Sequence, residues 1–144
     1  MGIIKSIERF PYEGKAYNLV VTSFGDPSGP KQTLYQGVVH PEYPVYKNTG
    51  TVCKMSEVQL HDVIVERDNT FWRIEMINEY AVNEDFQKIT FDDGRMLKCS
   101  LVHKLMVTSP KKCPASMLEV GDELADVDIN GMTKKRVVKK TLKG

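Results

Sequence analysis

A hydroxyl side chain and an imidazole lie close together in the second half of the chain. Ser100 comes three residues before His103, directly after an apolar segment. At this spacing just past a strand, both side chains can point at one backbone amide of the same loop. Activation of a weak nucleophile requires its base within hydrogen-bond reach. The structural alternative is that His103 is a hydrogen-bonded histidine that holds this loop.

The other side chains that could take part in chemistry are scattered along the sequence. Cys53 is the only thiol of the first half, and its place in the middle of a strand is typical of a small buried hydrophobic residue. The adjacent His61 and Asp62 point to opposite faces if they lie on a strand. For the other candidates we expect packing roles: His40 beside Val38 and Val39, Cys99 and Cys113 in the core or in loops, and Trp72 as a core anchor.

A β-hairpin must position Ser100 and His103. Its predicted strands are Lys88 to Asp92 and Arg95 to Cys99, joined by a two-residue turn at Asp93-Gly94. The alternating residues Leu105 and Val107 then return the chain to a sheet. Further strands are predicted at 1–10, 15–22, 72–77, 80–82 and 134–142, with a turn at 11–14, a loop at 23–31, and strand, short helical turn and strand over 51–65.

Composition favours one soluble globular domain spanning residues 1–144. The chain has 144 residues, 41% hydrophobic and 27% charged, and a net charge of +1. That charge argues against a nucleic-acid partner, although the basic run from Lys134 to Lys140 is either a solvated strand edge or a phosphate-binding patch. We expect no membrane span, no signal peptide and, from three cysteines without a CxxC pair, no disulfide framework, zinc site or cofactor. An intracellular, cytoplasmic location follows.

The segment KITFDDGRMLKCSLVH, Lys88 to His103, resembles block B of the Hint family, the fold shared by inteins and hedgehog autoprocessing domains. That block is a strand, Asp-Gly-Arg, a short apolar strand, and then a Thr or Ser three positions before a His. The likeness is greatest to phage-type split inteins. It implies an all-β fold with two related halves, in which Ser100 and His103 occupy autoprocessing positions.

Other Hint blocks are also similar, but they occur in permuted order. Tyr12 to Val21 resembles block F, with Asn18 where Asp is usual, and Gly37 to His40 resembles the C-terminal block G. Residues Val45 to Ile64 then follow the frame of the N-terminal block. The chain therefore resembles a circularly permuted Hint domain, natural or engineered, in which 1–40 match the C-terminal intein segment and 41–144 the N-terminal one. Packing tolerates permutation at an exposed loop.

The groups that start splicing are missing from this pattern. Pro41 stands where the cyclising asparagine is expected, and the frame finds no Cys, Ser or Thr at the nucleophile position between Val38 and Pro41. Ser100, His103 and His40 remain as relic positions. We therefore expect no catalytic residues, with Cys53 as the one candidate for a displaced nucleophile.

Two internal alignments support related halves. Ser56 to Asp68 aligns without a gap on Ser116 to Asp128, and Met76 to Thr90 aligns on Ser6 to Val20, with Ile77 on Ile7 and Ile89 on Leu19. The two alignments are compatible only if the chain is treated as nearly circular. They predict two related all-β halves packed about an approximate two-fold axis.

These observations favour a non-splicing Hint-fold structural or interaction module. Its expected partners are other proteins or further copies of itself, and the resemblance suggests a phage particle as the setting. The similar terminal strands Ile3 to Ser6 and Arg136 to Thr141 suggest assembly through exposed strand edges. The alternative is an intein-type autoprocessing domain that cleaves or splices itself, and a third class is a nucleic-acid binder that uses the basic C-terminal strand.

Overall fold

The computed structural model describes residues 2–26, 28–35, 37–67, 69–108 and 111–125. Within these ranges the fold is all-β, as predicted, and its antiparallel strands form a ten-stranded sheet without an α-helix. No helix in this part of the chain has the length and apolar character needed to cross a membrane. The elements are β1 (Gly2–Ser23), β2 (Gln32–Thr33), β3 (Pro44–Lys47), β4 (Val52–Lys54), η1 (Met55–Glu57), β5 (Val63–Val65), β6 (Phe71–Phe91), β7 (Met96–Ser100), β8 (Lys104–Val107), β9 (Lys111–Pro114), η2 (Ala115–Met117) and β10 (Glu123–Leu124).

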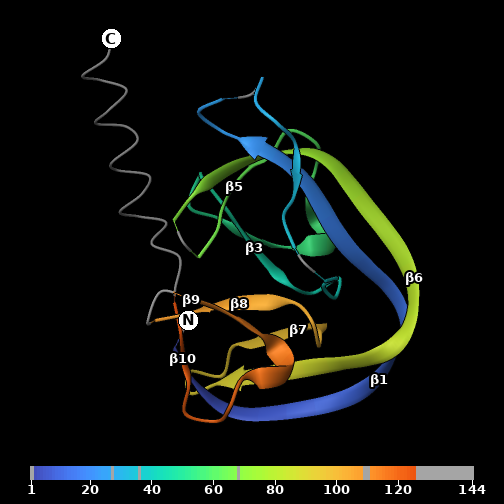
Figure 1. Cartoon of the computed structure of the whole chain (residues 1–144), viewed down its shortest axis with the longest axis vertical. Coiled ribbons are helices and arrows are strands. Elements are labelled where there is room, and N and C mark those ends of the chain that lie inside the picture. Colours follow the sequence, from blue (N-terminus) through green and yellow to red (C-terminus); the bar gives the residue numbers. More distant parts are fainter. Residues whose placement is uncertain (1, 27, 36, 68, 109–110, 126–144) are drawn as a thin grey trace.

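Two long strands organise the molecule. β1 and β6 pair in antiparallel register over almost their whole lengths and curve side by side around two groups of shorter strands (Figure 1). The predicted turn at 11–14 is therefore wrong, since Pro11 pairs with Asp85 and Gly14 with Val82 inside this ribbon. β6 is likewise continuous where two separate strands were predicted. Between Ser6 and Ala16 no other described strand pairs with β1, so a proline that lacks an N–H is tolerated there.

The predicted hairpin is present, but its turn is one residue longer. β6 and β7 pair from Phe86 with Ser100 to Thr90 with Met96. The amide of Gly94 donates to the carbonyl of Phe91 (3.0 Å), which makes 92–94 a three-residue loop. Gly94 alone carries the left-handed conformation, with φ of 89°. This is the common three-residue hairpin loop in which a left-handed glycine closes the turn.

Two short segments of the chain repeat the same hydrogen bonds. Each begins with a 3-10 helix, η1 or η2, and each then turns through a left-handed residue, His61 (φ 71°) or Gly121 (φ 97°). The repeat confirms the predicted alignment from Ser56 to Asp62 on Ser116 to Asp122. In the first segment the amides of Met55, Ser56 and His61 donate to the carbonyls of Tyr43, Pro41 and Ile74, and the Gln59 amide donates to the Asp62 carboxylate. In the second segment the equivalent amides of Ala115, Ser116 and Gly121 donate to the carbonyls of His103, Leu101 and Ile4, and the Glu119 amide donates to the Asp122 carboxylate.

The pairing of β1 with β6 also follows the predicted alignment. Ile7 pairs with Ile89, and the residues aligned on them, Ile77 and Leu19, pair with each other. If each residue of β1 is replaced by the β6 residue aligned on it, and the reverse, the same positions remain paired.

The first described residues lie beside the last described strand. Gly2 pairs with Leu124 and Ile3 with Glu123, and the chain start is drawn next to β10 in Figure 1. Ile4 pairs with Phe91 on the other side, so the beginning of β1 is interior to the sheet and the predicted free edge at Ile3 to Ser6 is wrong there. The outer strands of the sheet order are β4 and β9. The predicted strand over 134–142 lies outside the described residues.

A single apolar cluster joins both groups of short strands to the long ribbon. Its fully buried side chains come from β1, β5, β6, β7 and β10 and from the segments before β3 and after β4. The largest are Tyr43, Phe91, Ile4, Leu19, Met55, Ile64, Ile74, Ile89, Leu97 and Leu124.

Candidate functional site

The segment from Val38 to His40 lies inside the sheet, between β1 and β7. On one side Val39 exchanges two backbone hydrogen bonds with Tyr17, at 2.9 and 3.0 Å. On the other side the Ser100 amide donates to Val38 (2.9 Å) and the His40 amide donates to Lys98 (3.2 Å). The predicted junction of the two intein-like segments is thus a paired interior strand whose backbone is engaged on both sides.

Ser100 contacts this junction directly. Its Oγ accepts a hydrogen bond from the amide of Val38 at 3.1 Å, and only 3% of the residue is exposed. Gly37 packs against the same hydroxyl: a Cβ at position 37 would lie 2.2 Å from Ser100 Oγ and 3.1 Å from the backbone N of His103. The structure therefore brings the Ser100 hydroxyl and the backbone of His103 to the Gly37–Val38 peptide, whereas the His103 imidazole is bonded to Tyr43.

Asn18 fixes the loop before the junction, and sequence reasoning noted it only as a departure from aspartate. Its Nδ2 donates to the carbonyls of Tyr35 (2.8 Å) and Gly37 (2.9 Å), while its Oδ1 accepts from the amides of Leu19 (2.8 Å) and Tyr35 (3.2 Å). An ionised aspartate could only accept hydrogen bonds. The two carbonyl acceptors explain why an amide side chain is needed at this position.

His103 is buried and hydrogen-bonded. Its Nε2 lies 3.0 Å from the hydroxyl of Tyr43, and its ring packs edge-on against the rings of Tyr35 and Tyr43. Only 3% of the residue is exposed. Burial, with smaller effects from the positive charges of Arg67 and Lys112, lowers the pKa of His103 to about 3. The imidazole is therefore neutral at physiological pH.

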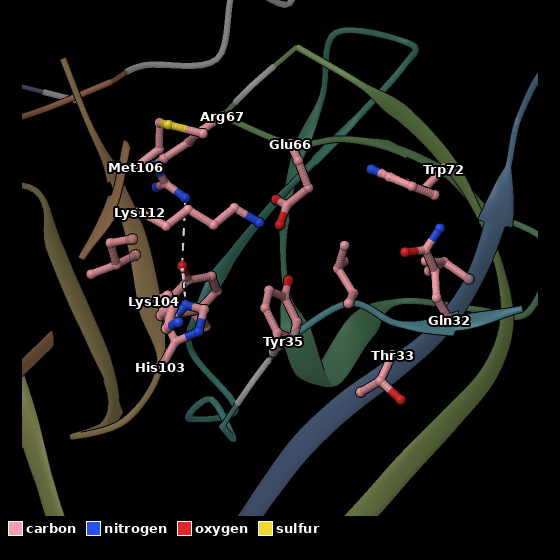
Figure 2. Close-up of a pocket in the computed structure, with 14 residues that line it drawn as sticks. Gln32, Thr33, Tyr35, Glu66, Arg67, Trp72, His103, Lys104, Met106 and Lys112 are labelled. Carbon is pink, nitrogen blue, oxygen red and sulfur yellow. Dashed lines mark hydrogen bonds between the residues drawn. The ribbon is translucent and has the colours of Figure 1, made fainter. Parts of the chain in front are cut away.

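Arg67 completes this buried group and was missed by sequence reasoning. Its Nη1 donates to the Tyr43 hydroxyl at 3.5 Å, and its guanidinium lies 5.8 Å from the centre of the Tyr46 ring. Figure 2 shows the resulting chain of hydrogen bonds from Arg67 through a hydroxyl to His103. In the sequence, Arg67 stands in the charged run Glu66-Arg67-Asp68, which is typical of an exposed loop. Only tertiary contacts could reveal that it is buried.

His40 lies on the other side of the junction and caps a turn. Its Nδ1 accepts the amide hydrogen of Glu42 at 3.1 Å, and its ring packs on Tyr12 with centroids 4.8 Å apart. Burial and the positive charge of Lys98 lower its pKa, against the opposing effect of Glu42. The contacts of the described residues do not link His40 to His103, so the two predicted imidazoles do not form one catalytic group.

The cysteines are not placed for nucleophilic attack. Cys53 lies on β4 opposite Val45, and burial raises the pKa of its thiol. Cys99 is fully buried, and its pKa rises to about 12 for the same reason. Cys113 lies on β9, and all three thiols are free. A thiol with a raised pKa is a weak nucleophile at neutral pH, and no described contact joins Cys53 to His40 or His103.

His61 and Asp62 form no dyad. They lie in the turn after η1 and not on a strand as predicted, with His61 exposed in the left-handed conformation. The carboxylate of Asp62 accepts from the amide of Gln59 (2.9 Å) and lies 3.3 Å from Lys47 Nζ. Trp72 is half-buried, donates to Thr70 (2.7 Å) and lines a cavity, so it is more than the core anchor that was predicted.

The described residues contain no cluster of histidine, cysteine or carboxylate side chains that could hold a metal ion. They supply a Gly37–Val38 peptide that is hydrogen-bonded to Ser100 and Asn18 and a buried Arg67–Tyr43–His103 group, but no activated nucleophile. No protein-family model matches the chain, and a search of curated proteins finds none similar to it. The likeness to the Hint family therefore depends on the residues and contacts given above.

Proposed function

We propose that this chain is a circularly permuted, non-splicing Hint-type domain that serves as a structural or interaction module. One observation carries the proposal: the strand that resembles the C-terminal intein block, Gly37 to His40, packs on the Ser100–His103 segment that resembles block B. These contacts support a scaffold of the autoprocessing type. The reacting groups that the resemblance implies are missing, because Pro41 has no side-chain amide.

The repeated hydrogen bonds and the paired chain start support the permuted arrangement. A two-fold relation between the halves explains why η1 and η2 make the same contacts and why β1 and β6 exchange without a change of register. The pairing of Gly2 with Leu124 brings β1 beside β10, as the permuted arrangement requires.

The permutation can be tested by reversing it. A chain opened between Pro41 and Glu42, with Gly144 joined to Met1 by a glycine–serine linker, should melt cooperatively with the circular dichroism of the original. The control variant is opened between Ile89 and Thr90, where β6 pairs with both β1 and β7, and should not fold. Loss of folding only in the first variant would contradict the proposed arrangement.

Autoprocessing can be tested by intact mass after incubation with a thiol. We expect the full mass to persist, because no described thiol contacts the junction and the Ser100 hydroxyl there is buried and accepts the Val38 amide hydrogen. Cleavage near His40 or Cys53 that disappears in Cys53→Ala would instead establish the autoprocessing function. The Cys113→Ala variant is the matched control, since Cys113 is also half-buried and lies on the outer strand β9.

Assembly through strand edges is the proposed mode of interaction, with copies of this chain or phage particle proteins as partners. β4 and β9 are the outer strands of the described sheet order, so they replace the N-terminal edge as candidates. Sedimentation equilibrium should show self-association that Val52→Lys on β4 weakens and Met76→Lys on β6 leaves unchanged. Their side chains are similarly exposed, at 55% and 52%. A monomer at high concentration would exclude self-assembly.

A further inference from the structure

A cavity of about 200 Å³ lies next to the buried Arg67–Tyr43–His103 group. Arg67, His103 and Lys112 line one side of it, and Trp72 and Gln32 lie on the opposite side (Figure 2). Lys112 and Gln32 are exposed, so the cavity opens between them, while Arg67 and His103 lie at its buried end.

One assignment of the protons uses every donor and acceptor that meet within this group. A guanidinium can only donate, so the Tyr43 oxygen accepts from Arg67 Nη1. The single hydroxyl proton of Tyr43 is then donated to Nε2 of His103, at 3.0 Å. Since this imidazole is neutral, its proton lies on Nδ1.

Three donors are consequently left without an acceptor. Nε and Nη2 of Arg67 and Nδ1 of His103 are buried and have no hydrogen-bond partner among the described residues. Arg67 is only 8% exposed. A buried charge without a partner is costly, and native proteins pair such groups or bind an ion there. This end of the cavity therefore needs an acceptor that the described residues do not supply.

The geometry of the free donors suggests the acceptor's shape. Nε and Nη2 form one edge of the guanidinium, and this edge gives two parallel hydrogen bonds to a carboxylate or phosphate. Lys104 and Lys112 add positive charge to the walls, against the single negative charge of Glu66. Half-buried Met106 lies beside Arg67 in Figure 2, and its flexible side chain can shift to admit an oxygen atom.

The other walls favour an organic acid over an inorganic anion. Aromatic and aliphatic side chains line the cavity beyond the donors, and these contact a hydrocarbon group better than they contact water. They are Val21, Leu34, Tyr35, Trp72 and Leu105.

We propose that this cavity binds a small carboxylate, held by the Nε–Nη2 edge of Arg67, with its apolar part against Tyr35 and Trp72. The carboxylate can belong to a free organic acid or to the C-terminus of a partner peptide. This binding activity is independent of the proposed structural role and of any autoprocessing.

Nuclear magnetic resonance titration of the full chain tests the proposal. The probes are phenylacetate and N-acetyl-glycyl-leucine, which represent the two sources, with phenylacetamide and the amidated dipeptide as neutral controls and inorganic phosphate as a third anion. We expect one of the two acids, and neither amide, to shift the Arg67 Nε resonance. The acid that binds more tightly identifies the source.

Two variants make the outcome decisive. Arg67→Lys keeps the charge but loses the two-donor edge, so we expect at least a roughly tenfold loss of affinity. The control Arg73→Lys makes the same change outside the cavity, at a residue paired with Glu75, and should bind normally. Lys112→Gln, an exposed change, should weaken binding a few-fold even if Arg67→Lys fails to fold. Absence of any shift, equal binding of acid and amide, unchanged affinity in Lys112→Gln, or binding of phosphate alone would overturn the proposal.

Discussion

Gly37→Ala tests the contact on which the proposed site depends. A Cβ at position 37 would lie 2.2 Å from Ser100 Oγ, 3.0 Å from Val102 Cγ2 and 3.1 Å from the backbone N of His103. Ser100 is buried and bonded to the Val38 amide, so its hydroxyl cannot move away without the loss of that hydrogen bond. The backbone of His103 is held as well, because its carbonyl accepts the amide of Ala115.

The expected cost follows from three contributions. Overpacking of a well-packed site costs about 1–3 kcal/mol, and loss of the Val38–Ser100 hydrogen bond adds about 1 kcal/mol. The lower entropy of the unfolded alanine chain returns about 0.4–1 kcal/mol. We therefore expect Gly37→Ala to lower the free energy of unfolding by about 1–4 kcal/mol, and Tm by about 3–12 °C for a domain of this size.

Urea denaturation of four variants separates the contact from a general effect of alanine. Gly25→Ala is the matched control, because a Cβ there has nothing within 4 Å, and its stability should be unchanged or slightly higher. In a Ser100→Ala background the closest clash is absent, so Gly37→Ala should cost at least about 1 kcal/mol less than in the original chain. A cost below about 0.5 kcal/mol in the original chain, or an equal cost in both backgrounds, would refute the proposed packing of Gly37 on Ser100.

Three further predictions concern the buried polar groups. The pKa of His103 is about 3 in the folded chain against 6.5 ordinarily, so between these values the unfolded state binds a proton that the folded state does not. The free energy of unfolding should therefore fall as pH drops from 6.5 toward 3, by at most about 1.4 kcal/mol per pH unit. In His103→Gln, the dependence of the urea midpoint on pH should be weaker. Asn18→Asp turns a carboxylate toward the carbonyls of Tyr35 and Gly37, so it should cost about 2–4 kcal/mol at pH 7 and less at pH 4, where a protonated acid can donate; urea midpoints at both pH values check this. Cys99, with its pKa of about 12 and full burial, should resist a thiol reagent such as dithionitrobenzoate until the chain unfolds, whereas Cys53 and Cys113 should react first; peptide mapping after timed labelling checks the order, and early labelling of Cys99 would contradict it.

Local patterns predicted the elements that depend on near neighbours. The hairpin of β6 and β7, the loop after Ser23 and the turn between β4 and β5 each follow from alternation and turn residues over a few positions. The repeat around Ser56 and Ser116 was also visible, because its apolar and carboxylate positions recur without a gap. The aspartates Asp62 and Asp122 recur for a physical reason: each carboxylate accepts the amide three residues earlier.

Features that depend on distant partners could not be predicted. Pro11 and Gly14 are turn residues by local preference, but the long pairing with β6 overrides that preference and keeps β1 continuous. Burial of Arg67 requires Tyr43 and Tyr46 from one part of the chain and His103 from another, and nothing in its own neighbours indicates this. The same holds for Tyr43, whose hydroxyl meets a ring 60 residues further along the chain.

The repeat and the buried group meet at one pair of residues. Tyr43 and His103 occupy the same position in the two repeated segments, since their carbonyls accept the equivalent amides of Met55 and Ala115. In the proposed two-fold arrangement, counterparts near the axis face each other, and these two side chains are indeed 3.0 Å apart. Two identical residues at such a place would bring like groups together, whereas tyrosine and a neutral histidine offer one donor and one acceptor. Arg67 binds Tyr43 from one half only, so it makes the pair directional and leaves its own Nε–Nη2 edge without a partner among the described residues. Two differences between the halves, tyrosine opposite histidine and the added arginine, thus turn a symmetric packing contact into the anion site proposed above.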